Sequence, residues 1–357
     1  MTEQQTGSVA PRGRWRVRDG SYAITARRSG SEEDTTLNIA EFAVGEVGEG
    51  RAKLRVVRSG ADWGVASLQV TIAEKDLPAL AGRSVKEPDL LSTHDGIGGY
   101  FAPDSALFPS APHPSDVAQG LVGDCRVASA FQALAASKGG PALIQSLITT
   151  TEGGYNVRLV PTTGPKALPA SGARPETMTI SRHLPVSRHN RDPLYLLSGS
   201  PYGPTSTTPL WPAVLEKAFA TMWGGYAALD GAEERPVLAA LGLGDFVHVN
   251  WMSDEETKPA VAKAKMPSLA ADGYAITTAA RGKRHNYAVL AAGEDGVLVS
   301  DPNTPRGGDA EKRWKSATLI KNAEKLPGSD EFPLLFTWDA FFQAFMWFYA
   351  ARPPAKK

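Results

Sequence analysis

The sequence has few of the features that mark several protein classes. Its 357 residues contain one cysteine, which excludes an internal disulfide and a thiolate metal cage. Lys plus Arg and Asp plus Glu are equal at 38 each, so the net charge is zero. A neutral chain has no overall attraction to nucleic acid or to an anionic membrane. We therefore expect no nucleic-acid partner. The low use of cysteine is typical of a reducing compartment.

Long hydrophobic runs are also missing. Residues 1–13 lack the order of basic and then apolar residues that marks a signal peptide. The longest nearly uncharged apolar run, "AFFQAFMWFYAA" at 340–351, is too short to span a bilayer, and we interpret it as a buried helix. These features predict no membrane span. They also predict a cytoplasmic location, or export without a cleaved signal peptide.

Short alternating runs dominate the first part of the chain. The stretch "RWRVRDGSYAITARR" at 14–28 holds two of them around Asp19 and Gly20, a favoured pair for a two-residue hairpin turn. Such a turn would pair the two runs with each other and place Trp15 opposite Ile24 on one apolar face.

Further alternating runs, "AKLRVVRSG" and "ASLQVTIAE", complete a small antiparallel β domain, which we predict over residues 1–92. We interpret its arginines as a solvated strand face, because acidic residues in the same segment nearly balance them. We expect this domain to serve docking or regulation, so it could offer a surface to a partner. A stretch rich in Gly, Pro and Ser at 96–116 leads into the second domain, predicted over 93–357.

The single cysteine, Cys125, stands where a helix is predicted to begin. Apolar residues recur at helical spacing from Val127 to Leu134, and Lys-Gly-Gly at 138–140 supplies a stop. In the first turn of a helix, the unpaired amide N–H groups and the helix dipole stabilise a thiolate. Two interpretations follow: a nucleophile, or a small buried core residue.

A nucleophilic cysteine needs a base that a third group orients. His285 begins "HNYAVLAAGEDGVLVSDPNTPRG", two apolar runs joined by Gly-Glu-Asp-Gly, which predicts a hairpin. The returning strand would bring Asp301 and Asn303 beside His285. Either could accept the Nδ1–H of His285 and leave Nε2 to face the thiol. The alternative is a histidine at a strand end without a partner.

Five segments resemble the motifs of one family, in order. "QGLVGDCRVASAFQALA" resembles the active-site signature of the calpain family of papain-like cysteine proteases, which reads Gln-Gly-x-Leu-Gly-Asp-Cys-Trp. "LWPAVLEKAFATMWGGYAALDG", "RHNYAVLAAG", "SDPNTPRG" and "FTWDAFFQAF" resemble the family's Leu-Trp helix, its histidine segment, its Asn-Pro-Trp loop and the close of its protease core. The resemblance covers about residues 100 to 348.

The resemblance implies an α+β fold. By this resemblance the core would be a papain-like two-lobed cysteine protease core, with a helical lobe and a twisted antiparallel β lobe. The small all-β N-terminal domain predicted from the alternating runs would precede it. It also implies an intracellular-type cysteine endopeptidase that cuts protein substrates through a thioester acyl-enzyme. Cys125 would be the nucleophile, His285 the general base, and Gln119 an oxyanion donor together with the backbone N–H of the cysteine. Asp301 would orient the histidine. Asn303 is the alternative, because the register of the hairpin is not determined by sequence.

The sequence departs from the family pattern at two positions. Arg126 stands where the family has Trp after the nucleophile, and Asn303 takes the place of the Trp that blocks the family's cleft without calcium. The sequence also has no EF-hand loop, zinc-ligand spacing or phosphate-binding loop. We therefore expect no cofactor, no metal and no calcium switch. Two other functions stay open: a transglutaminase-like acyl transferase and an inactive calpain-like binding protein.

Overall fold

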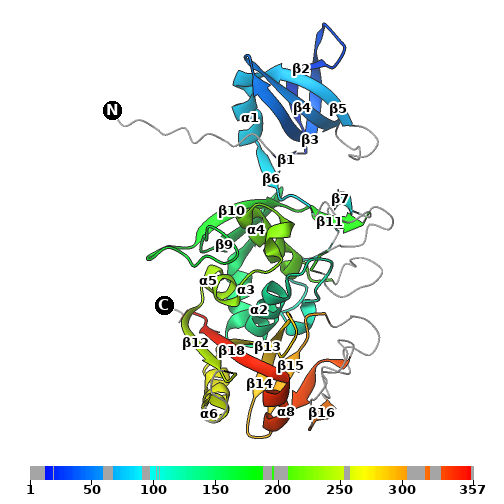
Figure 1. Ribbon diagram of the computed structural model, residues 1–357. Coiled ribbons are helices and arrows are strands. Elements are labelled where there is room, and N and C mark those ends of the chain that lie inside the picture. The colour runs from blue at the N-terminus through cyan, green and yellow to red at the C-terminus, as the bar shows by residue number, and fades with distance from the viewer. Residues whose placement is uncertain are drawn as a thin grey trace. The chain divides into compact units, whose positions relative to one another are not determined.

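The chain forms two compact units (Figure 1). The computed structural model describes residues 13–18, 20–58, 67–90, 97–101, 103, 105–187, 195–196, 208–252, 258–303, 318–321 and 331–354. The first unit comprises Met1–Asp89, Thr151–Tyr155 and Thr179–Arg182, and the second comprises Leu90–Thr150, Asn156–Met178 and His183–Lys357.

A six-stranded antiparallel sheet makes up most of the first unit. Its elements are β1 (Gly13–Val17), β2 (Tyr22–Arg28), β3 (Asp34–Gly48), β4 (Arg51–Arg58), β5 (Ser67–Ala73), α1 (Leu77–Gly82) and β6 (Ser84–Glu87). The strand order is β2-β5-β4-β3-β1-β6, and β2 also pairs with β3, so four of the strands close into a ring. Alternate residues along the strands point inward, and they form one apolar core that includes Trp15, Ile39 and Phe42.

The predicted hairpin between the first two strands is wrong. Both strands form, but β1 pairs with β3 and β6, while β2 pairs with β3 and β5. Trp15 therefore lies opposite Phe42 and not opposite Ile24. Because β3 is 15 residues long, β2 can pair along its first part and β1 along its middle. The predicted turn residue Asp19 lies outside the described residues.

Helices and short strands fill the first half of the second unit. They are β7 (Ile97–Phe101), α2 (Cys125–Ala136), α3 (Gly140–Leu147), β8 (Ile148–Thr150), β9 (Gly154–Leu159), β10 (Glu176–Ser181), β11 (Leu184–Ser187), α4 (Trp211–Trp223) and α5 (Glu234–Ala240). The first two residues of β9 and the last three of β10 are counted with the first unit. The predicted helix from Cys125 is confirmed as α2, which is buried along most of its length and packs against α3, α4 and α5. Phe131 of α2 contacts both Trp211 and Phe219 of α4.

A seven-stranded sheet dominates the second half of this unit. Its elements are β12 (Gly244–Asn250), α6 (Lys258–Ala271), β13 (Ala275–Ala280), β14 (Asn286–Ala292), β15 (Val297–Ser300), β16 (Thr318–Ile320), β17 (Leu334–Phe336), α8 (Trp338–Ala344) and β18 (Phe345–Arg352). The order is β12-β18-β13-β14-β15-β17-β16, antiparallel except for β16 with β17. Every residue of β13 is buried, as expected for a strand covered on both faces.

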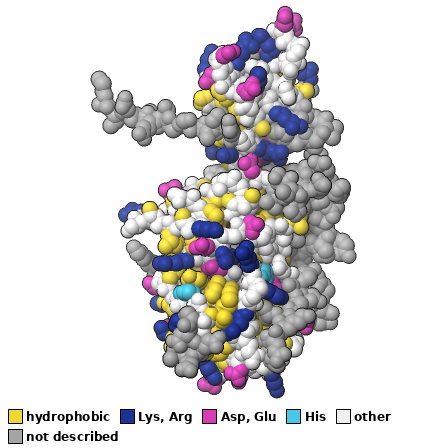
Figure 2. Space-filling view, in the orientation of Figure 1, with side chains coloured by type: hydrophobic (Ala, Val, Ile, Leu, Met, Phe, Trp, Pro, Cys, Tyr) yellow, Lys and Arg dark blue, Asp and Glu magenta, His cyan; other side chains and the backbone are white. Residues whose placement is uncertain are grey.

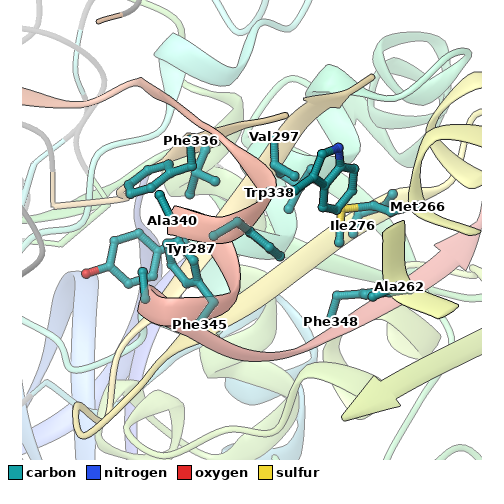
Figure 3. Packing of buried hydrophobic residues seen from close by; sticks show 14 of the residues in the cluster. Ala262, Met266, Ile276, Tyr287, Val297, Phe336, Trp338, Ala340, Phe345 and Phe348 are labelled. Carbon is teal, nitrogen blue, oxygen red and sulfur yellow. The ribbon is translucent and has the colours of Figure 1, made fainter. Parts of the chain in front are cut away.

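The coverage of this sheet explains the burial. Helix α2 packs against β13 and β14, and α6 contacts β12 and β14. Residues of α6 and α8 join the strands in one apolar cluster, where Met266 lies beside Trp338 and Tyr287 of β14 packs against Phe345 of β18 (Figure 3). Helices and sheet thus occur together in one unit, and the predicted α+β class is confirmed.

The sequence predicts a buried helix over the apolar run at 340–351, and this prediction is wrong. The first part of the run belongs to α8, and the chain then continues as β18 in the interior of the sheet. The aromatic residues from Phe345 to Tyr349 favour a strand, and pairing with both β12 and β13 satisfies the backbone. Local apolar content alone could not distinguish the two structures.

Candidate active site

Cys125 is the first residue of α2. The thiol is buried, with 8% of the residue exposed, and the carbonyl oxygen of Arg284 lies 4.0 Å from its Sγ. The preceding residue, Asp124, occupies the N-cap position, but its side chain makes no capping hydrogen bond. The cysteine therefore lies in the first helical turn, where the helix dipole favours negative charge.

His285 and Asp301 meet at the open end of a hairpin. The predicted hairpin is confirmed: β14 and β15 pair antiparallel, with His285 directly before β14 and Asp301 directly after β15. The Nε2 atom of His285 lies 2.7 Å from Oδ1 of Asp301, a strong hydrogen bond between two largely buried side chains.

The two ring nitrogens of His285 are exchanged relative to the prediction. The sequence predicts that Nδ1 bonds the carboxylate and Nε2 faces the thiol, whereas Nε2 bonds Asp301. The Cys125 side chain also acts on His285 and raises its pKa. Because Nε2 is already engaged, Nδ1 is the nitrogen left for the cysteine. Rotation of the imidazole about χ2 exchanges its two nitrogens without any change of the backbone, so spacing along the sequence does not reveal which nitrogen each partner receives.

The charge state of His285 depends on both partners. Burial alone lowers the pKa of His285, but hydrogen bonds with Asp301 and Cys125, and the negative charges of both, raise this pKa to about 9. An imidazolium is therefore stable here at neutral pH. The ring of Tyr287 stands edge-on to the imidazole, with ring centroids 4.7 Å apart. Sequence reasoning missed this contact.

Asn303 lies close to the same histidine but makes a weaker contact. Its Nδ2 is 3.5 Å from Nε2 of His285, and its side chain is exposed. Its backbone N–H donates to Oδ1 of Asp301 over 2.8 Å. In this structure, Asn303 thus helps to fix the carboxylate, and the short bond to the imidazole belongs to Asp301.

Gln119 approaches the site from the segment before α2. Its backbone N–H donates to the carbonyl of Pro302 over 2.7 Å, which ties it to the loop that carries Asp301. Its side-chain Nε2 donates to the carbonyl of Val122 over 2.7 Å. A primary amide has two N–H bonds, so one remains beyond this contact.

A buried pair of carboxyl groups includes Asp124, the residue directly before the nucleophile. Asp124 and Glu216 of α4 are each 1% exposed and contact each other. Burial raises the pKa of both groups, that of Asp124 to about 7, and the charge of Asp124 adds to the rise for Glu216. By geometry, both carboxyl oxygens of Asp124 lack a hydrogen-bond partner among the described residues. Carboxylates only accept, so a shared proton supplies the missing donor.

The structure offers few metal ligands near one another. Within the described ranges, no group of three or more His, Cys, Asp or Glu side chains is placed to hold a metal ion.

No helix in the described part of the chain is both long and apolar enough to cross a membrane. On the face drawn in Figure 2, basic and acidic side chains are interspersed.

Comparison with known proteins places this geometry in a family. No curated protein matches the chain significantly. The family model of the calpain family cysteine proteases matches residues 100–294, which include Gln119, Cys125 and His285. Asp301 and Asn303 lie just beyond the matched range. The match covers more than half of the 357 residues, and the chain belongs to the calpain family of cysteine proteases.

Proposed function

We propose that the protein is an active cysteine endopeptidase that hydrolyses peptide bonds in protein substrates. The observation that carries the proposal is the position of His285, which bonds Asp301 and directly follows Arg284, whose carbonyl oxygen lies 4.0 Å from Sγ of Cys125. The side chains of His285, Asp301 and Cys125 come from the two ends of one hairpin and the start of a distant helix. Such a constellation is the one that nucleophilic thiol catalysis needs.

The chemistry begins with an ion pair between a Cys125 thiolate and a His285 imidazolium. The thiolate Sγ attacks the carbonyl carbon of the scissile bond, and the carbonyl electron pair moves onto oxygen. The backbone N–H of Cys125 and the free amide N–H of Gln119 would stabilise this oxyanion. Donors of this kind are each worth about 3 kcal/mol of transition-state stabilisation.

The second half of the cycle returns the enzyme to its starting state. The imidazolium gives its proton to the leaving amine as the C–N bond breaks, which leaves a thioester on Cys125. The neutral imidazole then takes a proton from water, the hydroxide attacks the thioester carbonyl, and the acid product leaves with the thiolate restored. Asp301 holds His285 in the required orientation throughout and stabilises its charged form.

Two alternatives make different predictions. An acyl transferase with the same residues would pass the acyl group to an amine, and an inactive homologue would not form the thioester at all. Keeping Cys125, His285 and Gln119 together has no use in a binding module, so we favour the enzyme.

The test uses an unstructured protein substrate, with and without a small primary amine, and mass spectrometry of the products. The peptidase proposal predicts new amino termini in both samples and a negligible fraction of amine adducts. In parallel, a thiol-directed electrophile should label Cys125 in the folded protein and react much more slowly in His285→Ala. Amine adducts without new termini would support acyl transfer, and equal labelling of both proteins without any cleavage would support an inactive homologue.

We also propose that the first unit docks or regulates, as expected for a domain with its own apolar core. Its N-terminal segment, Met1–Asp89, lies outside the matched range of the family.

A further inference from the structure

The residue that follows the nucleophile bonds the residue that follows the base. Nε of Arg126 donates to Oδ1 of Asn286 over 3.3 Å. Arg126 is covalently attached to Cys125, and Asn286 is attached to His285. This contact therefore links the start of α2 to the start of β14 one residue away from the Cys125–His285 pair.

Glu234, at the start of α5, completes this cluster. Its Oε1 lies 2.9 Å from Nε of Arg126 and also accepts a hydrogen bond from Nδ2 of Asn286. A further guanidinium nitrogen, Nη1, donates to the carbonyl of Ala232 over 2.7 Å. One arginine thus bonds three groups, from the loop before α5, from α5 and from β14. Its planar fork of donors can hold such an arrangement, whereas a point charge cannot.

The burial of Glu234 makes the cluster rigid. Its side chain is 6% exposed, against 33% for Arg126, so the carboxylate has little water to replace a lost partner. Burial raises the pKa of Glu234, while the charge of Arg126 and the hydrogen bond with Asn286 oppose this rise. Removing the charge of Arg126 would strongly destabilise this buried carboxylate.

This cluster replaces an aromatic residue. The calpain signature resembled by the sequence has Trp after the nucleophile, and an indole offers a single N–H. One indole N–H could not donate to both the Glu234 carboxylate and the Asn286 amide oxygen, as Arg126 does. The structure therefore assigns Arg126 a specific task that the Trp of the family cannot perform in the same way.

We propose that Arg126, Glu234 and Asn286 form a positioning cluster that sets the distance between Cys125 and His285. In this proposal the cluster acts through the two residues beside it. This inference rests on the proposed peptidase function. A fixed separation keeps the thiolate–imidazolium pair together, so its loss should reduce turnover and thiol reactivity while leaving substrate binding largely unchanged.

The main experiment compares the wild type with Arg126→Met, which keeps the apolar stem and removes every donor. We expect kcat for a peptide to fall at least tenfold with KM changed less than twofold. The rate at which iodoacetamide alkylates Cys125 near pH 7 should fall in parallel. Arg235→Met is the matched control, because Arg235 lies next to Glu234 on α5 but is exposed and packs over the ring of Phe246. Both rates should match the wild type.

Loss of stability must be separated from loss of positioning, because Arg126→Met leaves Glu234 buried without its cation. The double variant Arg126→Met, Glu234→Gln removes that charge, and its unfolding midpoint should return toward the wild-type value. The proposal predicts that kcat stays low. Recovery of kcat to within twofold of the wild type would overturn it, and so would a loss carried by KM. Arg126→Lys should regain part of kcat, and Arg126→Trp should behave like Arg126→Met.

The two proposals fail in different ways. If the wild type cleaves no peptide, the peptidase function is wrong, and the alkylation rates still report on the Cys125–His285 pair. If the wild type cleaves and the double variant cleaves equally well, only the positioning cluster is wrong.

Discussion

Replacing Asp301 with Asn removes one negative charge from beside His285 and keeps an oxygen that can accept the Nε2–H. In the wild type, this nitrogen lies 2.7 Å from the Asp301 carboxylate, which is 3% exposed. At such a short range and with little water, the charge strongly favours the imidazolium. The variant therefore tests the electrostatic role of Asp301 separately from its role as a hydrogen-bond acceptor.

The magnitude follows from the pKa of His285. Burial lowers it, and the bonds and charges of Asp301 and Cys125 raise it from 6.5 to about 9. The net rise corresponds to about 3 kcal/mol in favour of the charged form. Asp301 and Cys125 both contribute to this rise, so loss of the Asp301 charge should lower the pKa by about 1 to 2 units, or roughly 1.4 to 2.7 kcal/mol.

Peptidase activity measured against pH reports this change. The imidazolium is the active form in the ion pair, so kcat/KM should fall as the pH rises through about 9 in the wild type. In Asp301→Asn, the same alkaline limb should begin about 1 to 2 pH units lower. The measurement needs a small peptide, constant ionic strength and pH values from 5 to 10.5.

Asn303→Ala is the matched control. The Asn303 side chain carries no charge and lies 3.5 Å from Nε2 of His285. The alkaline limb of kcat/KM in Asn303→Ala should therefore coincide with that of the wild type. An unmoved limb in Asp301→Asn would refute the electrostatic argument. A larger shift in Asn303→Ala than in Asp301→Asn would show that Asn303 is the orienting residue.

Three further predictions concern stability, domain organisation and calcium. Asp124 holds a proton in the folded protein up to about pH 7, whereas the unfolded chain releases it near 3.8, so this group destabilises the fold progressively as the pH rises between these values. Asp124→Asn supplies an N–H for Glu216. In urea unfolding, its advantage over the wild type in free energy of unfolding should grow by about 2 to 4 kcal/mol from pH 4 to pH 8. An equal advantage at both pH values would contradict the shared proton. A chain that begins at residue 92 should still cleave a small peptide but lose activity on its protein substrate, and insoluble inactive protein would show that the first unit is part of the core. Hydrolysis in excess chelator and in millimolar calcium should differ by less than tenfold, and a rise of tenfold or more on adding calcium, about 1.4 kcal/mol, would contradict the expected absence of a calcium switch.

Local sequence patterns predicted the elements that carry the site. The start of α2 at Cys125 and the hairpin from His285 to Asp301 depend on helix spacing, stop signals and turn residues that lie close together in the chain. The structure brings their ends together because α2 packs against β13 and β14. Propensity and spacing alone do not give that packing, and the resemblance to the calpain family supplied it.

Pairings and contacts between residues far apart in the chain could not be predicted from the sequence. The pairing of β1 with β3 in place of β2 depends on the length of β3, and the change from α8 to β18 depends on two neighbouring strands. Contacts between distant polar residues were missed for the same reason. No local pattern links the two members of such a pair, because they belong to different helices. This holds for Arg126 with Glu234 and for Asp124 with Glu216.

The central claim is that Cys125 is the nucleophile of a peptidase, and Cys125→Ala tests it most directly. Alanine fits the first turn of α2, so the variant should unfold cooperatively at a midpoint close to that of the wild type. The account predicts that the wild type hydrolyses a peptide and that a pure Cys125→Ala preparation shows no turnover above background. Turnover by that folded variant at a rate near that of the wild type would show that Cys125 is not the nucleophile.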